Sequence, residues 1–127
     1  MFAAPPVCNL LVIRSTDIER AVRFYELLGM EFGRERHGAG PEHFASVMGG
    51  FVFEIYPRRS EADSTLATRI GFHVDDVDGL VGVVRREGFE VVRGPFDRED
   101  GRAAVLKDFD GHTVEIVTPA GWEADGV

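Results

Sequence analysis

The stretch Asp110-Gly111-His112-Thr113-Val114-Glu115-Ile116-Val117 sets the pattern on which the rest of the chain is built. A glycine-containing turn leads into β-branched residues with one carboxylate, Glu115, in mid-strand. The earlier stretch Gly49-Gly50-Phe51-Val52-Phe53-Glu54-Ile55-Tyr56-Pro57 has the same layout. Asp-Gly and Gly-Gly between apolar runs predict hairpins with two-residue turns, because these residues accept positive φ. A charge in mid-strand breaks the strand pattern, and such breaks tend to fall at functional sites, which makes Glu54 and Glu115 the first candidates.

The remainder of the chain repeats itself around these two strands. Segments of equal length begin with aspartate and end with glycine at Asp17–Gly29 and Asp76–Gly88, and apolar residues recur within each at helical spacing. In the first of them Thr16 and Glu19 have the spacing of a capping box. We predict helices at 16–28 and 76–87, strands at 8–14, 30–36, 42–48, 51–57, 70–74 and 89–93, a charged loop at 97–101, and a last strand after Gly111.

Each copy therefore reads as strand–helix–strand–strand–strand. The first copy covers 8–57, a polar linker covers 58–68, and the second copy covers 69–119, within one domain of 1–127. A unit of about 55 residues cannot bury both faces of its own sheet. The predicted fold is α+β, with two paired βαβββ repeats forming a curved mixed sheet around a cavity.

Composition narrows the possible partners. The 127 residues include 14 basic and 22 acidic side chains, a net charge of -8, which disfavours nucleic acid and anionic membrane surfaces. The single cysteine, Cys8, excludes an internal disulfide, and its place at the start of an apolar strand predicts a buried structural thiol. No run of 18 apolar residues and no signal-peptide pattern is present, so we predict a cytoplasmic protein without a membrane span.

Two longer motifs carry a resemblance to a known family. They are Thr16-Asp17-Ile18-Glu19-Arg20-Ala21-Val22-Arg23-Phe24-Tyr25 with Leu28-Gly29-Met30, and Asp108-Phe109-Asp110-Gly111-His112-Thr113-Val114-Glu115. The chain resembles the vicinal oxygen chelate superfamily, which includes glyoxalase I, extradiol dioxygenases, and fosfomycin- and bleomycin-resistance proteins. The resemblance covers about residues 8–118 and implies the glyoxalase/bleomycin resistance-like fold. It also implies a homodimer whose cavities are built from both subunits.

The resemblance implies four inward strand positions that hold a divalent cation in the metal-dependent members. In this sequence they correspond to Leu10, Glu54, Arg69 and Glu115. Leucine cannot coordinate a metal, and a guanidinium has no lone pair to offer. A shift of one residue in the correspondence would put Asn9 in place of Leu10. It would not supply a metal ligand in place of Arg69. We therefore predict no metal and no cofactor, the alternative being one divalent metal ion per site.

Arg69 and two histidines are further candidates for the site. Arg69 is predicted to pair bidentately with a cavity carboxylate, either as a structural ion pair or as a ligand contact. His73 lies four residues later on the same strand face, at the cavity rim or as a satisfied histidine. If the Gly49-Gly50 turn has two residues, position 45 faces Glu54 and His43 lies diagonally from it.

His43 is then either a structural histidine or a general base, and with Glu54 and Glu115 it would complete the ligand set if a metal is present. Tyr56 shares the face of Glu54 and is a predicted pocket wall. His112 points away from Glu115 and is predicted to be structural, and His37 beside a glycine-rich loop carries no prediction.

Two functions compete. The first is a metal-free binding protein of the bleomycin-resistance type, which sequesters a small cationic or aromatic molecule in an acidic dimer cavity. The second is a diverged glyoxalase-like lyase or isomerase, in which Glu54 or Glu115 takes a proton and Arg69 stabilises the enediolate. A ring-cleaving dioxygenase is disfavoured because its iron needs two histidines and one carboxylate.

Overall fold

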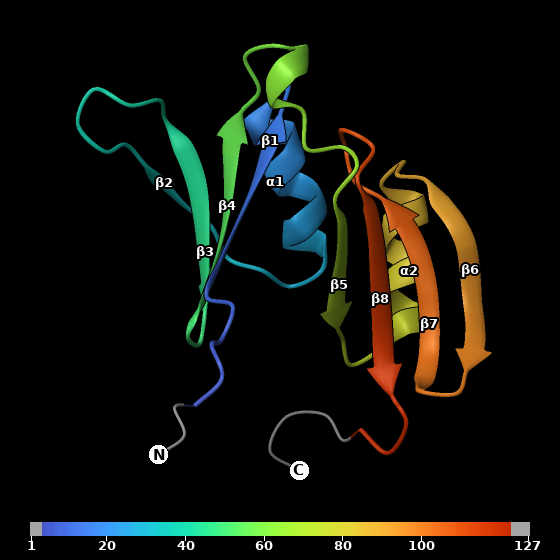
Figure 1. Ribbon diagram of the computed structural model, residues 1–127. Helices are drawn as coiled ribbons and strands as arrows, with labels where there is room; N and C mark the ends of the chain where they lie inside the picture. Colours follow the sequence, from blue (N-terminus) through green and yellow to red (C-terminus); the bar gives the residue numbers. More distant parts are fainter. Residues whose placement is uncertain (1–3, 123–127) are drawn as a thin grey trace.

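The computed structural model describes residues 4–122, so the predicted domain of 1–127 extends beyond them at both ends (Figure 1). The first repeat comprises β1 (Leu10–Ser15), α1 (Ile18–Leu27), β2 (Gly33–Glu35), β3 (His43–Met48) and β4 (Phe51–Pro57). The second comprises β5 (Arg69–His73), α2 (Val77–Arg86), β6 (Val91–Arg98), β7 (Gly101–Lys107) and β8 (Thr113–Pro119). A short 3-10 helix, η1 (Glu61–Asp63), lies in the segment that connects them. Neither α-helix has the length and apolarity needed to cross a membrane.

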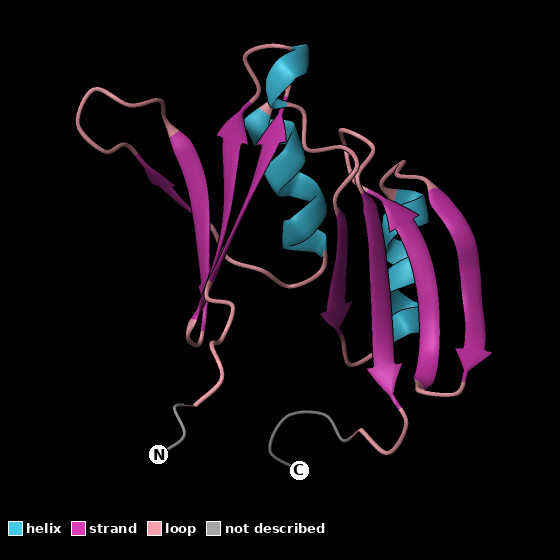
Figure 2. Ribbon diagram, viewed as in Figure 1, coloured by secondary structure: helices cyan, strands magenta, loops and turns pink. Residues whose placement is uncertain are grey.

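The strands form two mixed sheets with the same topology, one in each repeat (Figure 2). The first sheet has the order β1-β4-β3-β2 and the second has the order β5-β8-β7-β6. In each, the first strand pairs in parallel with the last, and the other pairs are antiparallel. This identical order confirms the internal repeat and the predicted α+β architecture.

Helix α1 lies between the two sheets and joins them into one core (Figure 1). Its Tyr25 ring contacts Phe53 of β4 at 4.9 Å and Phe72 of β5 at 6.1 Å, measured between ring centroids. The neighbouring Phe24 packs edge-on against Phe89, which follows α2, at 5.2 Å. Phe24, Tyr25 and Phe53 are fully buried. Each sheet thus has an inner face, which packs toward the helices, and an open face on its other side.

The Asp108 carboxylate organises the loop between β7 and β8. Its Oδ1 accepts hydrogen bonds from the backbone N–H groups of Asp110, Gly111 and His112 at 3.1, 2.9 and 2.9 Å. Its Oδ2 accepts from the Tyr25 hydroxyl at 2.6 Å and lies 2.8 Å from His112 Nδ1. These bonds hold a five-residue loop, since Lys107 pairs with Thr113. The prediction of a two-residue Asp-Gly turn was therefore wrong.

The same loop fastens the first repeat to the second. Asp110 Oδ1 accepts from both the backbone N–H and the hydroxyl of Thr16, at 2.8 and 2.9 Å. His112 Nε2 lies 2.7 Å from the Thr65 hydroxyl, which also accepts from the Arg14 backbone N–H at 2.9 Å. The structural role predicted for His112 agrees with these contacts. The segment 58–68 does more than connect the two repeats, because Thr65 bridges them.

This bridging overturns the predicted capping box. Because the Thr16 hydroxyl is bound to Asp110, it does not cap helix α1. Asp17 is the N-cap instead, and its side chain accepts from the Arg20 backbone N–H at 3.2 Å. The helix consequently begins at Ile18, two residues later than predicted. Asp76 caps α2 in the same way.

Two other predictions also need correction. The charged segment 97–101 is not a loop, because β6 continues to Arg98 and β7 begins at Gly101. Gly101 allows this tight hairpin through its φ of 147°. It also allows β8 to approach closely, because a Cβ atom there would lie 2.2 Å from the Thr118 carbonyl oxygen. Cys8 is exposed rather than buried, because β1 starts only at Leu10 and the thiol precedes the sheet.

The Asp108 network generates a prediction about acid stability. Asp108→Asn should lower the free energy of unfolding by about 2–3 kcal/mol near neutral pH, because it weakens charge-assisted hydrogen bonds. Burial alone would raise the pKa of Asp108, but the hydrogen bonds from His112 and Tyr25 outweigh burial and hold that pKa below its usual value. Such a group stabilises the fold above its unfolded pKa of about 3.9 and loses this contribution as the pH falls through the folded value.

Urea unfolding at a series of pH values measures this effect. The difference between wild type and Asp108→Asn should shrink as the pH falls below about 4. The exposed Asp97→Asn serves as the control and should change stability by less than about 0.5 kcal/mol. A difference that stays constant down to acid pH would contradict the role given to the Asp108 carboxylate.

Candidate functional site

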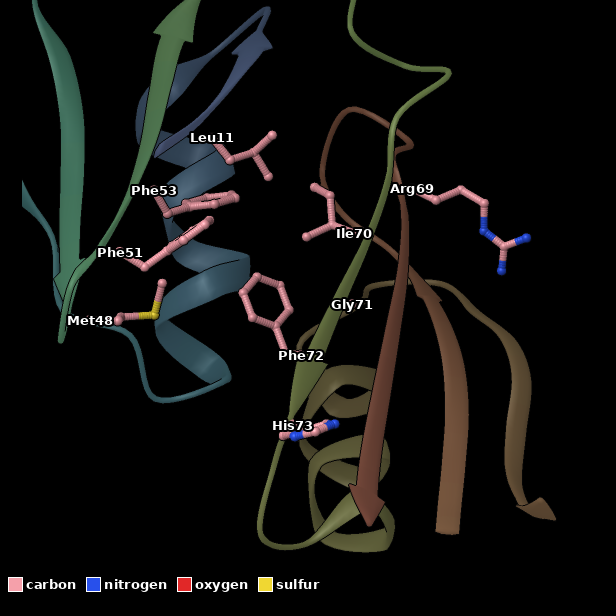
Figure 3. Close-up of a pocket in the computed structure, with 9 residues that line it drawn as sticks. All are labelled: Leu11, Met48, Phe51, Phe53, Arg69, Ile70, Gly71, Phe72 and His73. Atoms are coloured by element: carbon pink, nitrogen blue, oxygen red, sulfur yellow. The ribbon is translucent and has the colours of Figure 1, made fainter. Parts of the chain in front are cut away.

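The polar candidates lie on the open faces of the two sheets. Strand register puts Glu35, His43, Glu54, Tyr56 and Arg14 together on the open face of the first sheet. The open face of the second sheet carries Arg69, His73, Arg93, Arg98, Lys107 and Glu115. Figure 3 shows that Leu11 and Phe53 turn toward Ile70 and Phe72 across the space between the sheets, whereas Arg69 points away from it. The two open faces of one chain therefore point away from each other.

His43 is the centre of the group on the first sheet. Ala45 pairs with Glu54, as the two-residue turn predicts, and His43 Nε2 lies 3.5 Å from Glu54 Oε2. The imidazole is stacked on Tyr56, with 4.1 Å between ring centroids and 8° between planes. Its Nδ1 lies 3.2 Å from the Pro41 carbonyl oxygen. The side chain is only 1% exposed, so the strand and the tyrosine fix the orientation of the ring.

Two residues that sequence reasoning missed complete this group. Glu35 pairs with His43 across β2 and β3, and its Oε1 lies 3.3 Å from His43 Nε2. His37 Nε2 lies 3.4 Å from the same Glu35 oxygen. One donor atom from each of Glu35, His37, His43 and Glu54 lies within 4.8 Å of the others. The β2–β3 register, which spans a loop, is what brings Glu35 to His43.

The pKa of Tyr56 responds to its burial and to the charged side chains around it. Burial, followed by the negative charge of Glu54, raises the pKa of Tyr56, and the nearby Arg14 opposes this shift. The Arg14 guanidinium lies 5.1 Å from the centre of the tyrosine ring, in cation–π geometry. Tyr56 is therefore neutral at physiological pH, and it shares the open face of the sheet with Glu54, as its position in the strand predicts.

On the second sheet, Glu115 is held by Arg98 rather than by Arg69. The Arg98 guanidinium lies 2.9 Å from Glu115 Oε2 through Nη1, and Nη2 donates to Oε1 at 3.2 Å. Arg69 approaches Glu115 only to 3.9 Å and its side chain is 70% exposed, so the bidentate pair predicted for it does not form. Hydrogen bonds to Asp100 and Glu115 raise the pKa of Arg98. Sequence reasoning missed Arg98 because it assigned 97–101 to a loop.

The four positions that hold a metal in the family do not fit one here. Leu10 is an exposed apolar residue, and Arg69 is a cation. Glu115 already uses both of its oxygens on Arg98. No group of closely spaced ligand atoms within residues 4–122 contains both Glu54 and Glu115. The two mid-strand carboxylates thus belong to separate sites within one chain.

A largely apolar cavity of about 680 Å³ lies between the two sheets (Figure 3). Its walls come from the inner sides of β1, β3, β4 and β5, chiefly Leu11, Met48, Phe51, Phe53, Ile70 and Phe72. Of the predicted site residues, Arg69 and His73 border it. His73 also lies 5.7 Å from the Trp122 ring, which donates a hydrogen bond to Asp75 at 2.8 Å.

Two repeats of this topology, each with a glutamate in the middle of its last strand, define the class of protein. The chain belongs to the glyoxalase/bleomycin resistance protein/dioxygenase superfamily, whose family model matches residues 8–116. It is 26% identical over 111 residues to an uncharacterized protein of Mycolicibacterium smegmatis, covering 87% of this chain and 92% of that protein.

A plant enzyme and a bacterial structure are also similar to it. Lactoylglutathione lyase GLX1 of Arabidopsis thaliana is 29% identical over 119 residues, which cover 84% of this chain but only 42% of the plant protein. The crystal structure of TnmS3, an antibiotic binding protein from Streptomyces sp. CB03234, superposes with a TM-score of 0.73 at 22% identity. The match covers 93% of this chain and 99% of that one, and it shows a common fold.

The arginine pairing on the second sheet can be tested by stability. Arg98→Ala should lower the free energy of unfolding more than Arg69→Ala does, because it removes the paired contacts to Glu115 and Asp100. Arg69→Ala should change it by less than about 0.5 kcal/mol, because its side chain is exposed. Urea unfolding at low and high salt gives both values, and salt should reduce the Arg98 effect. An equal cost for the two variants would contradict this assignment.

Proposed function

We propose that the chain binds a small aromatic molecule in a cavity formed between two copies of itself. The observation that carries this proposal is the opposite charge of the two open faces. Glu35 and Glu54 make the first face acidic, whereas the second carries Arg69, Arg93, Arg98 and Lys107 around Glu115. Because these faces point apart within one chain, they can meet only when the first sheet of one copy faces the second sheet of another.

The lining of these faces suits an aromatic ligand. On the first face, Tyr56 and His43 are stacked on each other, and Leu10, farther along the same face, is 50% exposed. On the second face, the Arg93 guanidinium lies 3.6 Å from the centre of the Phe96 ring. Apolar and aromatic walls with a few charged groups are typical of small-molecule sites. A cationic group on the ligand would lie against Glu54 and an anionic group against Arg69.

Similarity to known proteins supports a binding role and also offers a catalytic alternative. TnmS3, which shares the fold, is described as an antibiotic binding protein. The similarity to lactoylglutathione lyase GLX1 favours a second candidate, a glyoxalase-like lyase. In that candidate Glu54, next to His43, would be the base, because Glu115 is occupied by Arg98. The lyase candidate predicts formation of lactoylglutathione, and the binding proposal predicts none.

The binding proposal is tested by screening small aromatic molecules with and without a cationic group. Calorimetry should find molecules that bind one site per chain, with sedimentation showing a dimer. Glu54→Gln should weaken the binding of cationic molecules by about tenfold or more, and Arg69→Gln that of anionic ones, because each removes a charge facing the ligand. Glu26→Gln, on the exposed side of α1, is the matched control and should leave affinity unchanged.

Two results would count against this proposal. Ligands that bind equally well to wild type, Glu54→Gln and Arg69→Gln would place the site elsewhere. Full affinity in a chain that sediments as a monomer would remove the need for a second copy. The fluorescence of Trp122, beside His73 at the end of β5, offers an independent signal of occupancy near the second open face.

A further inference from the structure

We propose that Glu35, His37, His43 and Glu54 bind one divalent transition-metal ion of the Zn²⁺ type on the open face of the first sheet. Of the family's four metal positions, this site uses only Glu54. The other three ligands come from β2, β3 and the loop between them. The site lies within a single repeat of one chain, so it does not depend on the dimer cavity proposed above.

The first argument is an unpartnered nitrogen in a buried side chain. His43 is 1% exposed, and its Nε2 atom has no hydrogen-bond partner among residues 4–122. Because the Pro41 carbonyl oxygen can only accept, the 3.2 Å contact with Nδ1 places a proton on Nδ1. The lone pair of Nε2 in the neutral ring then points toward the carboxylates of Glu35 and Glu54. Buried polar atoms are rarely left in this state, and a cation between the three groups would satisfy them all.

The second argument is the spacing of the donor atoms. His43 Nε2 lies 3.3 Å from Glu35 Oε1 and 3.5 Å from Glu54 Oε2, and His37 Nε2 lies 3.4 Å from Glu35 Oε1. Charge-assisted hydrogen bonds would be shorter, about 2.7–2.9 Å. Ligands at about 2.0–2.1 Å from a tetrahedral Zn²⁺ lie about 3.3–3.4 Å from one another. The three distances are close to three of the six edges of such a tetrahedron, and all four donor atoms lie within 4.8 Å of one another.

The third argument is the way the fold holds the ligands. Glu35, His43 and Glu54 lie on adjacent strands, which fix their positions more firmly than loops would. The Pro41 carbonyl and the Tyr56 ring set the plane of the His43 imidazole, as groups behind a metal ligand commonly do. Only His37, 71% exposed, lies outside a strand, and it would complete the coordination as the ion binds.

The donor set also selects the kind of ion. Two imidazoles with two carboxylates suit Zn²⁺, Fe²⁺ or Ni²⁺, whereas Mg²⁺ and Ca²⁺ prefer oxygen ligands only. Glu35 and Glu54 together carry the charge that balances a divalent ion. His43 and His37 would bind through Nε2 in the neutral form, so affinity should fall as the pH is lowered.

Metal titration of the untagged full chain tests the site. After treatment with a chelator, calorimetry with Zn²⁺ should give one ion per chain, and Co²⁺ should give the absorption spectrum of a tetrahedral complex with mixed nitrogen and oxygen ligands. Bound Zn²⁺ should also raise Tm, since it binds the folded state. His37→Asn and Glu35→Gln should each weaken Zn²⁺ binding by about tenfold or more and alter the Co²⁺ spectrum.

These two variants are chosen because their side chains are 71% and 42% exposed, so they should fold normally. His73→Asn and Glu42→Gln are the matched controls, since both lie outside the group, and they should bind Zn²⁺ as wild type does. A chain that binds no Zn²⁺ or Co²⁺ would overturn the proposal. Unchanged Zn²⁺ affinity in both His37→Asn and Glu35→Gln would overturn it as well.

Discussion

The Asp108 carboxylate is the contact on which the arrangement of the two repeats depends. It accepts three backbone hydrogen bonds within its own loop and one from the Tyr25 hydroxyl of the other repeat. Tyr25 touches both Phe53 and Phe72, so the carboxylate fixes the ring that joins the two halves of the core. Because the group is buried and charged, only a nearly complete set of donors makes its burial favourable.

This central contact determines where the functional groups lie. With α1 held between the sheets, the inner faces are used for the core and the charged residues remain on the open faces. Glu54 and Glu115, equivalent positions in the two repeats, then acquire different partners: a buried histidine on one sheet and an arginine fork on the other. The same backbone unit, used twice, thus supplies one face rich in carboxylates and one rich in arginine.

Much of the fold was predictable from local pattern. Helical spacing, the repeated aspartate and glycine positions, and the Gly49-Gly50 turn predicted both helices, the succession of elements in each repeat and the approach of His43 to Glu54. The errors share a physical cause, which is competition from distant residues. Thr16 was a reasonable helix cap, but Asp110, 94 residues away in sequence, binds its hydroxyl. The loop at 108–112 is longer than an Asp-Gly turn because the Asp108 carboxylate accepts hydrogen bonds from three backbone N–H groups of the loop.

The site was less predictable, because it depends on pairings across loops. Arg98 reaches Glu115 only because β6 extends through a charged segment that lacks an apolar pattern. Glu35 lies opposite His43 because β2 pairs with β3, and these two strands are separated in sequence by the loop 36–42. Local spacing carries no information on either contact, and the strand at 33–35 is too short to show alternation.

The two glutamates differ in how their charge is balanced. The charge of Glu115 is neutralised by Arg98 within the chain. Within residues 4–122 no arginine or lysine pairs with Glu54, its neighbour His43 is a cation only when protonated, and Glu35 adds a second negative charge. A metal ion or the cationic group of a ligand would balance the negative charges of Glu35 and Glu54. Either one, once bound, would exclude the other from Glu54. The proposed metal binding and the proposed capture of a cationic molecule would therefore compete for one acidic face.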